Sequence, residues 1–318
     1  MKNAAAQTSL AVMYQEGRHA RKSLSKAAKW LKRASEQEYA QAQFMLGNMH
    51  MHGSGPVAQS YVAAAELYGK AAAQGNEVAS YNLGVLHREG WGVAQNDTAA
   101  ALHFRAAAEL GYAKAQYDLA DLYLDGSGVG GRDFGAAVGW LTRAAEEGHL
   151  QAQNTLGGLY HGGTLQGSSH GSSSGGGGDR SSTRTQQSFD GSVNGGGSDK
   201  KRWAADEGTV AVDFAEALRW YKAAADQGHA DSQNSLGRMH FVGEGPAERS
   251  DRKAFEWYEK AATQGHDGAQ FNLGLMHEKG WGISGGPNYD KAVVWYEKAA
   301  AQHHEKAKFN LKYIYDVS

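Results

Sequence analysis

The sequence repeats itself at a fixed interval, and this periodicity restricts the possible folds more than any other feature. A glycine that follows the pattern Ala-Ala-x-x recurs with spacings of 36, 37, 80 and 37 residues, at Gly75, Gly111, Gly148, Gly228 and Gly265. The interval of 80 residues equals one period plus 43 or 44 residues. A unit of this size buries little core alone, so such arrays fold by stacking neighbouring units.

The first half of each unit is predicted to be an amphipathic helix. A leucine and, three residues later, a Met, Leu or Ile mark one face of that helix. The leucines are Leu10, Leu46, Leu83, Leu119, Leu156, Leu236, Leu273 and Leu311. The next residue is Gly or Ala in seven of the eight units. Because a glycine inside a helix costs about 1 kcal/mol relative to alanine, its recurrence predicts the close approach of another helix.

A second helix is expected in each unit after a short loop. A glycine ends the first helix, as in a left-handed cap, at Gly17, Gly53, Gly90, Gly126, Gly163, Gly243 and Gly280. The second helix then follows a residue type that caps helix N-termini, at Ser23, Ser60, Asn96, Asp133, Asp213, Ser250 and Asn288. Alanines and large aromatic residues alternate at helical spacing along it, so that large rings face small alanines.

These motifs resemble the Sel1-like repeat, a relative of the tetratricopeptide repeat. The matching patterns are Ala-x-x-x-Leu-Gly-x-Met, the Gly-x-Gly-Val loops at residues 90–93 and 126–129, and Ala-x-x-Trp-Tyr-x-Lys-Ala-Ala-x-Gln-Gly at residues 254–265. The resemblance covers residues 4–163 and 208–315. It implies an all-α, right-handed α-solenoid superhelix of about seven helix-pair repeats plus a final half repeat, and a role in scaffolding protein complexes.

One segment interrupts the array. Residues 164–207 contain ten glycines and ten serines without periodicity, which predicts a disordered insertion, placed between the two helices of the fourth unit. The chain thus divides into repeats at 1–163, the insertion at 164–207, and repeats at 208–318 that end in a capping helix. Lys308 and Lys312 predict a solvent-exposed outer face for that last helix. The insertion is either an inert spacer or a regulatory arm.

Composition and motifs argue against catalysis and bound cofactors. The absence of cysteine excludes a disulfide framework, a cysteine-ligated zinc site and a thiol nucleophile. Histidine alternates with tyrosine at equivalent repeat positions, as His50 and Tyr14 do, which indicates packing rather than metal binding. Residues 126–131 match G-x-G-x-x-G, but a helix rather than a strand is expected before them, so no dinucleotide site is predicted. We expect no enzyme activity, cofactor or metal.

The charges and the hydropathy pattern bear on partners and location. With 32 basic and 34 acidic residues, no global charge attracts nucleic acid. No apolar run approaches the ~20 residues of a membrane span, and residues 1–9 lack the apolar core of a signal peptide. We therefore expect a cytoplasmic protein, with the lumen of the endoplasmic reticulum as an alternative only if the chain lacks its native N-terminus.

A polar column on the first helices is the leading candidate for a binding site. The residue before the repeated leucine is polar in seven of eight units. In the related tetratricopeptide fold this region faces the concave groove, where an Asn can hold a peptide backbone through its paired donor and acceptor. The resemblance thus implies a partner site at Asn82, Asp118, Asn272 and Asn310, with Arg238 nearby. A bound segment is expected to be basic near Asp118 and acidic near Asn272, and plain solvent exposure of the column is the alternative.

A basic cluster is the second candidate surface. Lys22, Lys26, Lys29, Lys32 and Arg33 follow one another closely, with few acidic residues nearby. They form either a solvated helix face or a surface for an acidic partner or anionic lipid headgroups.

The function expected from these features is that of a non-enzymatic scaffold or adaptor that binds other proteins or peptide segments. Two alternatives remain open. One is a regulatory subunit bound directly to a signalling enzyme. The other is a component of an endoplasmic-reticulum quality-control ubiquitin ligase complex, which contains such repeats.

Deletion of residues 166–205 tests whether the insertion is a spacer. Because closure entropy increases with loop length, the shorter loop is expected to keep or slightly raise the melting temperature. Thermal unfolding followed by circular dichroism measures this change. A fall of several degrees would mean that the segment packs on the solenoid.

Overall fold

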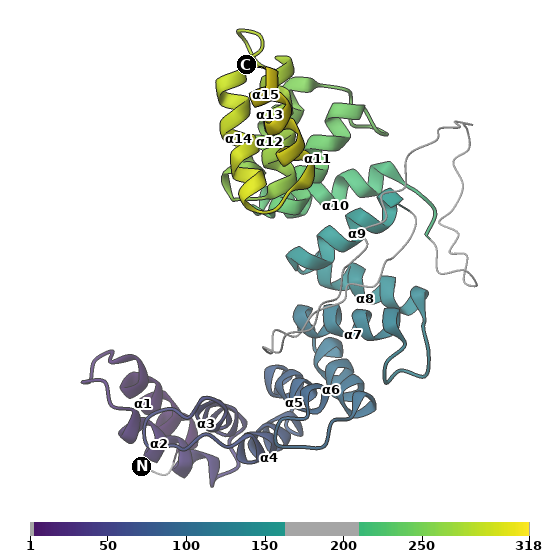
Figure 1. The fold of residues 1–318 in the computed structure, drawn as a ribbon. Helices are drawn as coiled ribbons and strands as arrows, with labels where there is room; N and C mark the ends of the chain where they lie inside the picture. Colours follow the sequence, from purple (N-terminus) through teal and green to yellow (C-terminus); the bar gives the residue numbers. More distant parts are fainter. Residues whose placement is uncertain (1–2, 163–209, 318) are drawn as a thin grey trace.

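The computed structural model describes residues 3–162 and 210–317, and within these ranges its regular elements are all helices (Figure 1). The helices are α1 (Ala4–Glu16), α2 (Leu24–Ser35), α3 (Ala40–His52), α4 (Tyr61–Ala72), α5 (Glu77–Glu89), α6 (Asp97–Glu109), α7 (Ala113–Asp125), α8 (Phe134–Glu146), α9 (Leu150–Gly162), α10 (Phe214–Asp226), α11 (Ala230–Val242), α12 (Asp251–Thr263), α13 (Asp267–Lys279), α14 (Tyr289–Ala301) and α15 (Glu305–Val317). Over the described residues, no helix combines the length and the apolar character that a membrane crossing requires.

Consecutive helices pack in pairs, from α1 with α2 to α13 with α14, and α15 packs against α14. The predicted all-α solenoid of seven helix pairs and a final half repeat is therefore confirmed for the described part of the chain. The insertion lies outside the described residues, between α9 and α10. Since α1 is already the first helix of a pair, α9 and α10 form the fifth pair, and the prediction that the insertion interrupts the fourth unit is wrong.

The pairs stack along a curved path (Figure 1). In the first half of the chain, α1, α3 and α5 lie on the inside of the bend, and α2, α4 and α6 lie on the outside. Each pair contacts the next mainly through its second helix, as α4 contacts α5. The inner surface there is formed by the first helices, which carry the predicted polar column.

The helix ends use the predicted caps. Before each of the seven second helices, the side chain of the predicted Ser, Asn or Asp accepts a hydrogen bond from a first-turn N–H. Six of the predicted glycines end a first helix with φ between 63° and 83°, which an L-residue with a side chain rarely adopts. The seventh, Gly163, lies outside the described residues.

An aromatic ring of the second helix accounts for the glycine inside the first. In five pairs, a Cβ atom placed on this glycine would lie only 2.5–2.8 Å from a ring carbon. These contacts join Gly47 to Tyr68, Gly84 to Phe104, Gly157 to Tyr221, Gly237 to Tyr258 and Gly274 to Tyr296. All five rings are buried, so the predicted close approach of a second helix is confirmed.

The remaining two pairs carry different residues at both positions. Ala11 shares a buried cluster with Leu31, and Ala120 shares one with Leu141. Alanine on the first helix thus occurs with leucine on the second, and glycine occurs with Tyr or Phe. This exchange keeps the volume between the two helices nearly constant, which a close-packed core requires.

Buried glutamines connect the units. Gln233 on α11 donates to the carbonyl of Ala225 on α10 at 3.1 Å and accepts from Gln264, after α12, at 2.7 Å. Gln153 on α9 accepts the equivalent hydrogen bond from Gln227, after α10, at 2.9 Å. Because Gln153 precedes the insertion and Gln227 follows it, the fifth pair keeps the contacts of an uninterrupted unit.

The last helix, α15, differs in part from the prediction. Lys308 and Lys312 are exposed, as expected for a terminal helix. The same helix also exposes Phe309, Tyr313 and Tyr315, whose exposed fractions are 57–71%. Its outer surface is therefore aromatic as well as charged.

The pairing of glycine with an aromatic ring predicts a rescue by a second mutation. Gly84→Ala is expected to lower the free energy of unfolding by about 1–3 kcal/mol because its methyl group overlaps the Phe104 ring. Adding Phe104→Leu recreates the Ala–Leu combination of the first and fourth pairs and should recover much of that loss. Urea unfolding of the single and double variants measures both effects.

A control comes from Gly139 on α8, where an added Cβ meets no atom within 4 Å. Gly139→Ala is expected to gain up to about 1 kcal/mol through helix propensity. The packing explanation fails if Gly84→Ala is as stable as the unmodified chain, or if Phe104→Leu makes that variant less stable still.

Candidate partner-binding surface

The predicted polar column lies on the first helices, but most of it is not freely exposed. Asn82, Asp118, Asn272 and Asn310 are all half-buried, and of the eight residues in the column only Ser9 is exposed. Asp118 and Asn272, for example, hydrogen-bond to side chains of the preceding first helix. Plain solvent exposure, the alternative considered from the sequence, therefore does not describe this column.

Asp118 forms part of the joint between α5 and α7. The hydroxyl of Tyr81 on α5 donates to Asp118 at 2.8 Å, and Nη1 of Arg88 lies 3.8 Å from the same carboxylate. Burial, followed by the charge of Asp118, raises the pKa of Tyr81 and keeps its hydroxyl protonated. The Asp118 side chain is only 13% exposed. It stabilises the stacking of two units and presents little of its carboxylate to a partner.

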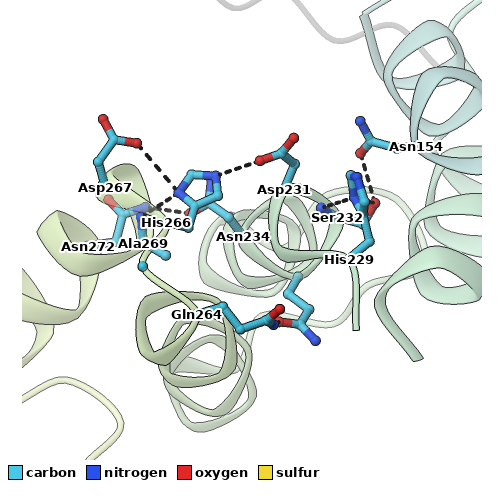
Figure 2. Close-up of polar contacts among 12 residues, drawn as sticks. Asn154, His229, Asp231, Ser232, Asn234, Gln264, His266, Asp267, Ala269 and Asn272 are labelled. Atoms are coloured by element: carbon cyan, nitrogen blue, oxygen red, sulfur yellow. Dashed lines mark hydrogen bonds and ion pairs between the residues drawn. The ribbon is translucent and has the colours of Figure 1, made fainter. Parts of the chain in front are cut away.

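A polar ladder runs across the first helices α9, α11 and α13 (Figure 2). Oγ of Ser232 on α11 donates to Oδ1 of Asn154 on α9 at 2.8 Å. Nδ2 of Asn272 on α13 donates to Oδ1 of Asn234 on α11 at 3.1 Å. These four residues, together with Asp231 and His266, are called the polar ladder below. Of the predicted site residues, Asn272 belongs to it.

His266 connects α11 and α13 within the ladder. Its Nε2 lies 3.2 Å from Asp231 on α11, and its Nδ1 accepts the N–H of Ala269 on α13 at 3.1 Å (Figure 2). Asp267 lies 3.8 Å from the same Nδ1. The hydrogen bond from His266 lowers the pKa of Asp231. This end of the ladder therefore carries negative charge at neutral pH.

A hollow of about 650 Å³ lies beside the ladder. Its lining includes Asn234, His266, Phe271, Asn272, His304 and Lys306. The ring of His304 stacks on that of Phe271 with centroids 4.7 Å apart. The asparagines supply amide donors and acceptors, and the stacked rings supply an apolar wall. This combination suits an extended peptide, whose backbone needs hydrogen bonds and whose side chains need apolar contacts.

Arg238 lies in a different cluster, with His161 and Glu244. Its Nη2 is 3.0 Å from both ring nitrogens of His161, and His161 Nε2 is 2.7 Å from Glu244. Burial opposes the ionisation of Glu244, but His161 and Arg238 together lower its pKa. Sequence reasoning missed this cluster because His161 lies 77 and 83 residues from its partners. Among the described residues, no group of three or more His, Asp or Glu side chains is arranged to hold a metal ion.

The five predicted basic residues lie on α2 and just before it, and all are exposed. Nζ of Lys26 lies 5.1 Å from the centre of the Tyr14 ring, and the Arg33 guanidinium lies 5.0 Å from that of Trp30. In Figure 1, α2 is near the N-terminus, whereas the polar ladder lies beyond α8. The two candidate surfaces are therefore separate.

Four histidines have a role that the sequence interpretation missed. Their alternation with tyrosine at one repeat position predicts packing only, but each also accepts a first-turn N–H through Nδ1 at 3.1–3.3 Å and so caps a first helix. They are His149, His229, His266 and His304, which precede α9, α11, α13 and α15. Asn3 and Asn76 cap α1 and α5 at the same repeat position. In the sequence, the alternation of Asn with His at this repeat position is the feature that indicates a capping residue.

Comparison with known proteins adds a family and two related structures. The Sel1 repeat pattern matches residues 4–39, 40–76, 78–112, 113–149, 203–229, 230–266 and 268–304. The crystal structure of a protective antigen of uropathogenic Escherichia coli, which displays an SLR fold, is 30% identical with a TM-score of 0.79; the alignment covers 99% of this chain, which spans 57% of that protein. A Sel1 repeat protein from Oxalobacter formigenes is 27% identical with a TM-score of 0.67, over 98% of this chain and 76% of that one. Curated proteins gave no match.

Burial favours the neutral form of two capping histidines. It is the main cause that lowers the pKa of His149, with Asp118 opposing it, and that of His229, with Asp231 opposing it. Protonation would place a hydrogen on Nδ1 and a positive charge at a helix N-terminus, where the helix dipole is also positive. Because the unfolded chain then binds protons more readily than the folded chain, stability falls as the pH drops below about 6.5.

Replacing both histidines with asparagine tests this pH dependence. Asparagine caps a helix without titrating, so His149→Asn/His229→Asn should match the unmodified chain at pH 7 and lose less stability at pH 5. The expected difference is about 1 kcal/mol per cap, measured as melting temperature against pH. His240→Asn is the control, because its ring contacts the carbonyl of Glu248 at the other end of α11. An equal loss in the double variant and the unmodified chain would contradict the capping role.

Proposed function

Because this chain belongs to the Sel1 repeat family, we propose that it is a protein-interaction scaffold whose polar ladder binds an extended segment of a partner protein. The backbone of that segment pairs with Asn234 and Asn272, and its side chains pack against the stacked rings of Phe271 and His304. A scaffold of this kind needs no catalytic group, because it acts by holding its partners in a complex.

The contact between Asn234 and Asn272 carries this proposal. It joins two consecutive units at 3.1 Å and borders a hollow of about 650 Å³. An asparagine amide offers two donors and an acceptor oxygen with two lone pairs. One hydrogen bond between the two side chains therefore uses only part of their capacity. The bond also holds both amides in place before a partner arrives, which reduces the entropy lost on binding.

The charges around the ladder revise the expected chemistry of the partner. Arg238, one of the two basic residues that favoured an acidic segment near Asn272, is in a cluster with His161 and Glu244. Asp231 and Asp267 flank His266 instead. We therefore propose a segment without acidic side chains at this position, since carboxylates would be repelled there.

The identity of the partner distinguishes a general scaffold from two more specific roles, a regulatory subunit of a signalling enzyme and a component of a ubiquitin ligase complex. A signalling enzyme as the direct partner would mean that the chain is a regulatory subunit. Ubiquitin-ligase components would place it in a quality-control complex of the endoplasmic reticulum. Affinity purification from the native cell, followed by mass spectrometry, distinguishes these outcomes.

The double variant Asn234→Ala/Asn272→Ala tests the ladder. It removes the amides that would hold the partner and one hydrogen bond worth about 1 kcal/mol, so the fold should persist and capture of groove-bound partners should be lost. Asn96→Ala is the matched control: it removes the cap of α6, for a similar loss of about 1 kcal/mol, at a site outside the ladder. Capture of the same partners by both variants would show that the ladder is not the binding site.

A further inference from the structure

The helix α2 differs in charge from every other second helix. It carries Lys26, Lys29, Lys32 and Arg33 and no carboxylate. In the other six second helices, the basic side chains are matched or outnumbered by acidic ones. Because all seven helices occupy the same place in the repeat, packing does not account for this difference.

The basic side chains of α2 form no ion pair with a described residue, whereas three of those on α10 and α12 do. On α10, Arg219 lies 3.3 Å from Glu216 and Lys222 lies 3.1 Å from Asp226. On α2, the described contacts of Lys26 and Arg33 are with the rings of Tyr14 and Trp30. The α2 basic face, defined as Lys22, Lys26, Lys29, Lys32 and Arg33, thus carries unneutralised positive charge.

The helix dipole accounts for the basic residues at only one end of this face. Lys32 and Arg33 lie in the last turn, where cations stabilise the helix dipole. Lys22 and Lys26 lie at the N-terminal end, where the dipole is already positive and α2 has no acidic residue in its first turn. Positive charge there weakens the helix, which favours a role in binding over a role in stability.

The spacing of these residues suits another helix. Within α2, Lys26, Lys29 and Lys32 recur every three residues and Arg33 lies four residues after Lys29, which places successive charges about 5–6 Å apart along one side of the helix. Acidic residues at positions i, i+4 and i+7 of a partner helix have the same separation. Two such helices can therefore pair several charges at once, and paired charges in a row contribute more than isolated surface ion pairs.

The packing of α2 argues against insertion into a membrane, and the aromatic residues beside it argue against nucleic acid. Insertion into a membrane interface needs an exposed apolar face, but the apolar face of α2, formed by Ala27, Ala28, Leu31 and Ala34, is buried in the solenoid. Single-stranded nucleic acid needs rings on which bases stack, but the rings of Tyr14 and Trp30 already lie beneath Lys26 and Arg33.

We infer that the α2 basic face is a second interaction surface and that it binds an acidic helix of a partner protein. The helix α2 lies on the outer side of the bend in Figure 1 and its basic residues are exposed, so this face can be occupied while the polar ladder holds another segment. The chain would then bring two proteins together, one at each surface.

Fluorescence anisotropy with two synthetic peptides tests this inference. The first is a helical peptide with glutamates at i, i+4, i+7 and i+11, and the second has the same composition with its glutamates distributed around the helix. The full chain should bind the first peptide, and binding should weaken as salt screens the charges. Lys26→Glu/Arg33→Glu should reduce the affinity by at least about tenfold.

The chain offers a matched control on α12. Lys253 follows its cap Ser250 as Lys26 follows Ser23, and Lys260 lies over the Trp257 ring as Arg33 lies over Trp30. Lys253→Glu/Lys260→Glu should therefore bind the first peptide as the unmodified chain does. If the charge reversal on α2 unfolds the chain, Lys26→Gln/Arg33→Gln replaces it and should lose part of the affinity.

Three results would overturn the inference. The first is equal binding of the two peptides, since helical spacing would then not matter. The second is equal loss of binding in the α2 and α12 variants. The third is tighter binding of phosphatidylserine vesicles or a single-stranded oligonucleotide than of the first peptide, which would identify a lipid or nucleic-acid surface.

Discussion

The contact between a small residue on the first helix and a large one on the second determines how closely each pair of helices packs. Where the second helix carries Tyr or Phe, as at Tyr258, a side chain on the first helix would overlap the ring, and Gly237 is required. Where it carries leucine, as at Leu141, Ala120 fits. Since each pair keeps the same interhelical volume, successive pairs stack with the same geometry. The curved array and the line of first helices on its inner side depend on this constraint.

The joints between pairs then decide what the first helices present. At one kind of joint, rings close the gap, as Tyr81 does against Tyr112. From α9 onward, Asn154 and Asn234 occupy the position of Tyr81 and bond to Ser232 and Asn272 across the joint. Amide joints leave hydrogen-bonding capacity at the surface, whereas the single hydroxyl donor of Tyr81 is already used by Asp118. This explains why the polar ladder is confined to the later units although the backbone pattern is the same throughout.

The two candidate surfaces use different forces. At the polar ladder, half-buried amides and histidines are held by neighbouring units, which favours recognition of an extended backbone with defined geometry. At the α2 basic face, exposed side chains carry charge without a partner, which favours fast but salt-sensitive association. Their separation along the solenoid follows from its elongated, repeating architecture, in which distant units do not touch.

The sequence by itself determined the helix pairs, the Ser, Asn and Asp caps of the second helices and the close approach of a second helix at the repeated glycine, because these are local features that recur with each period. It also located the basic face, since charge spacing on one helix is readable without a fold. Only the tertiary structure decided which polar residues meet. Asn272 bonds to Asn234 across 38 residues, and His161 meets Glu244 across 83. Such contacts depend on the rotation between neighbouring helix pairs. The long insertion also separates equivalent repeat positions by an irregular number of residues, so sequence spacing does not indicate which residues meet. A repeat pattern specifies neither, and so it placed Asp118 and Arg238 in an open groove where the structure pairs them with other units.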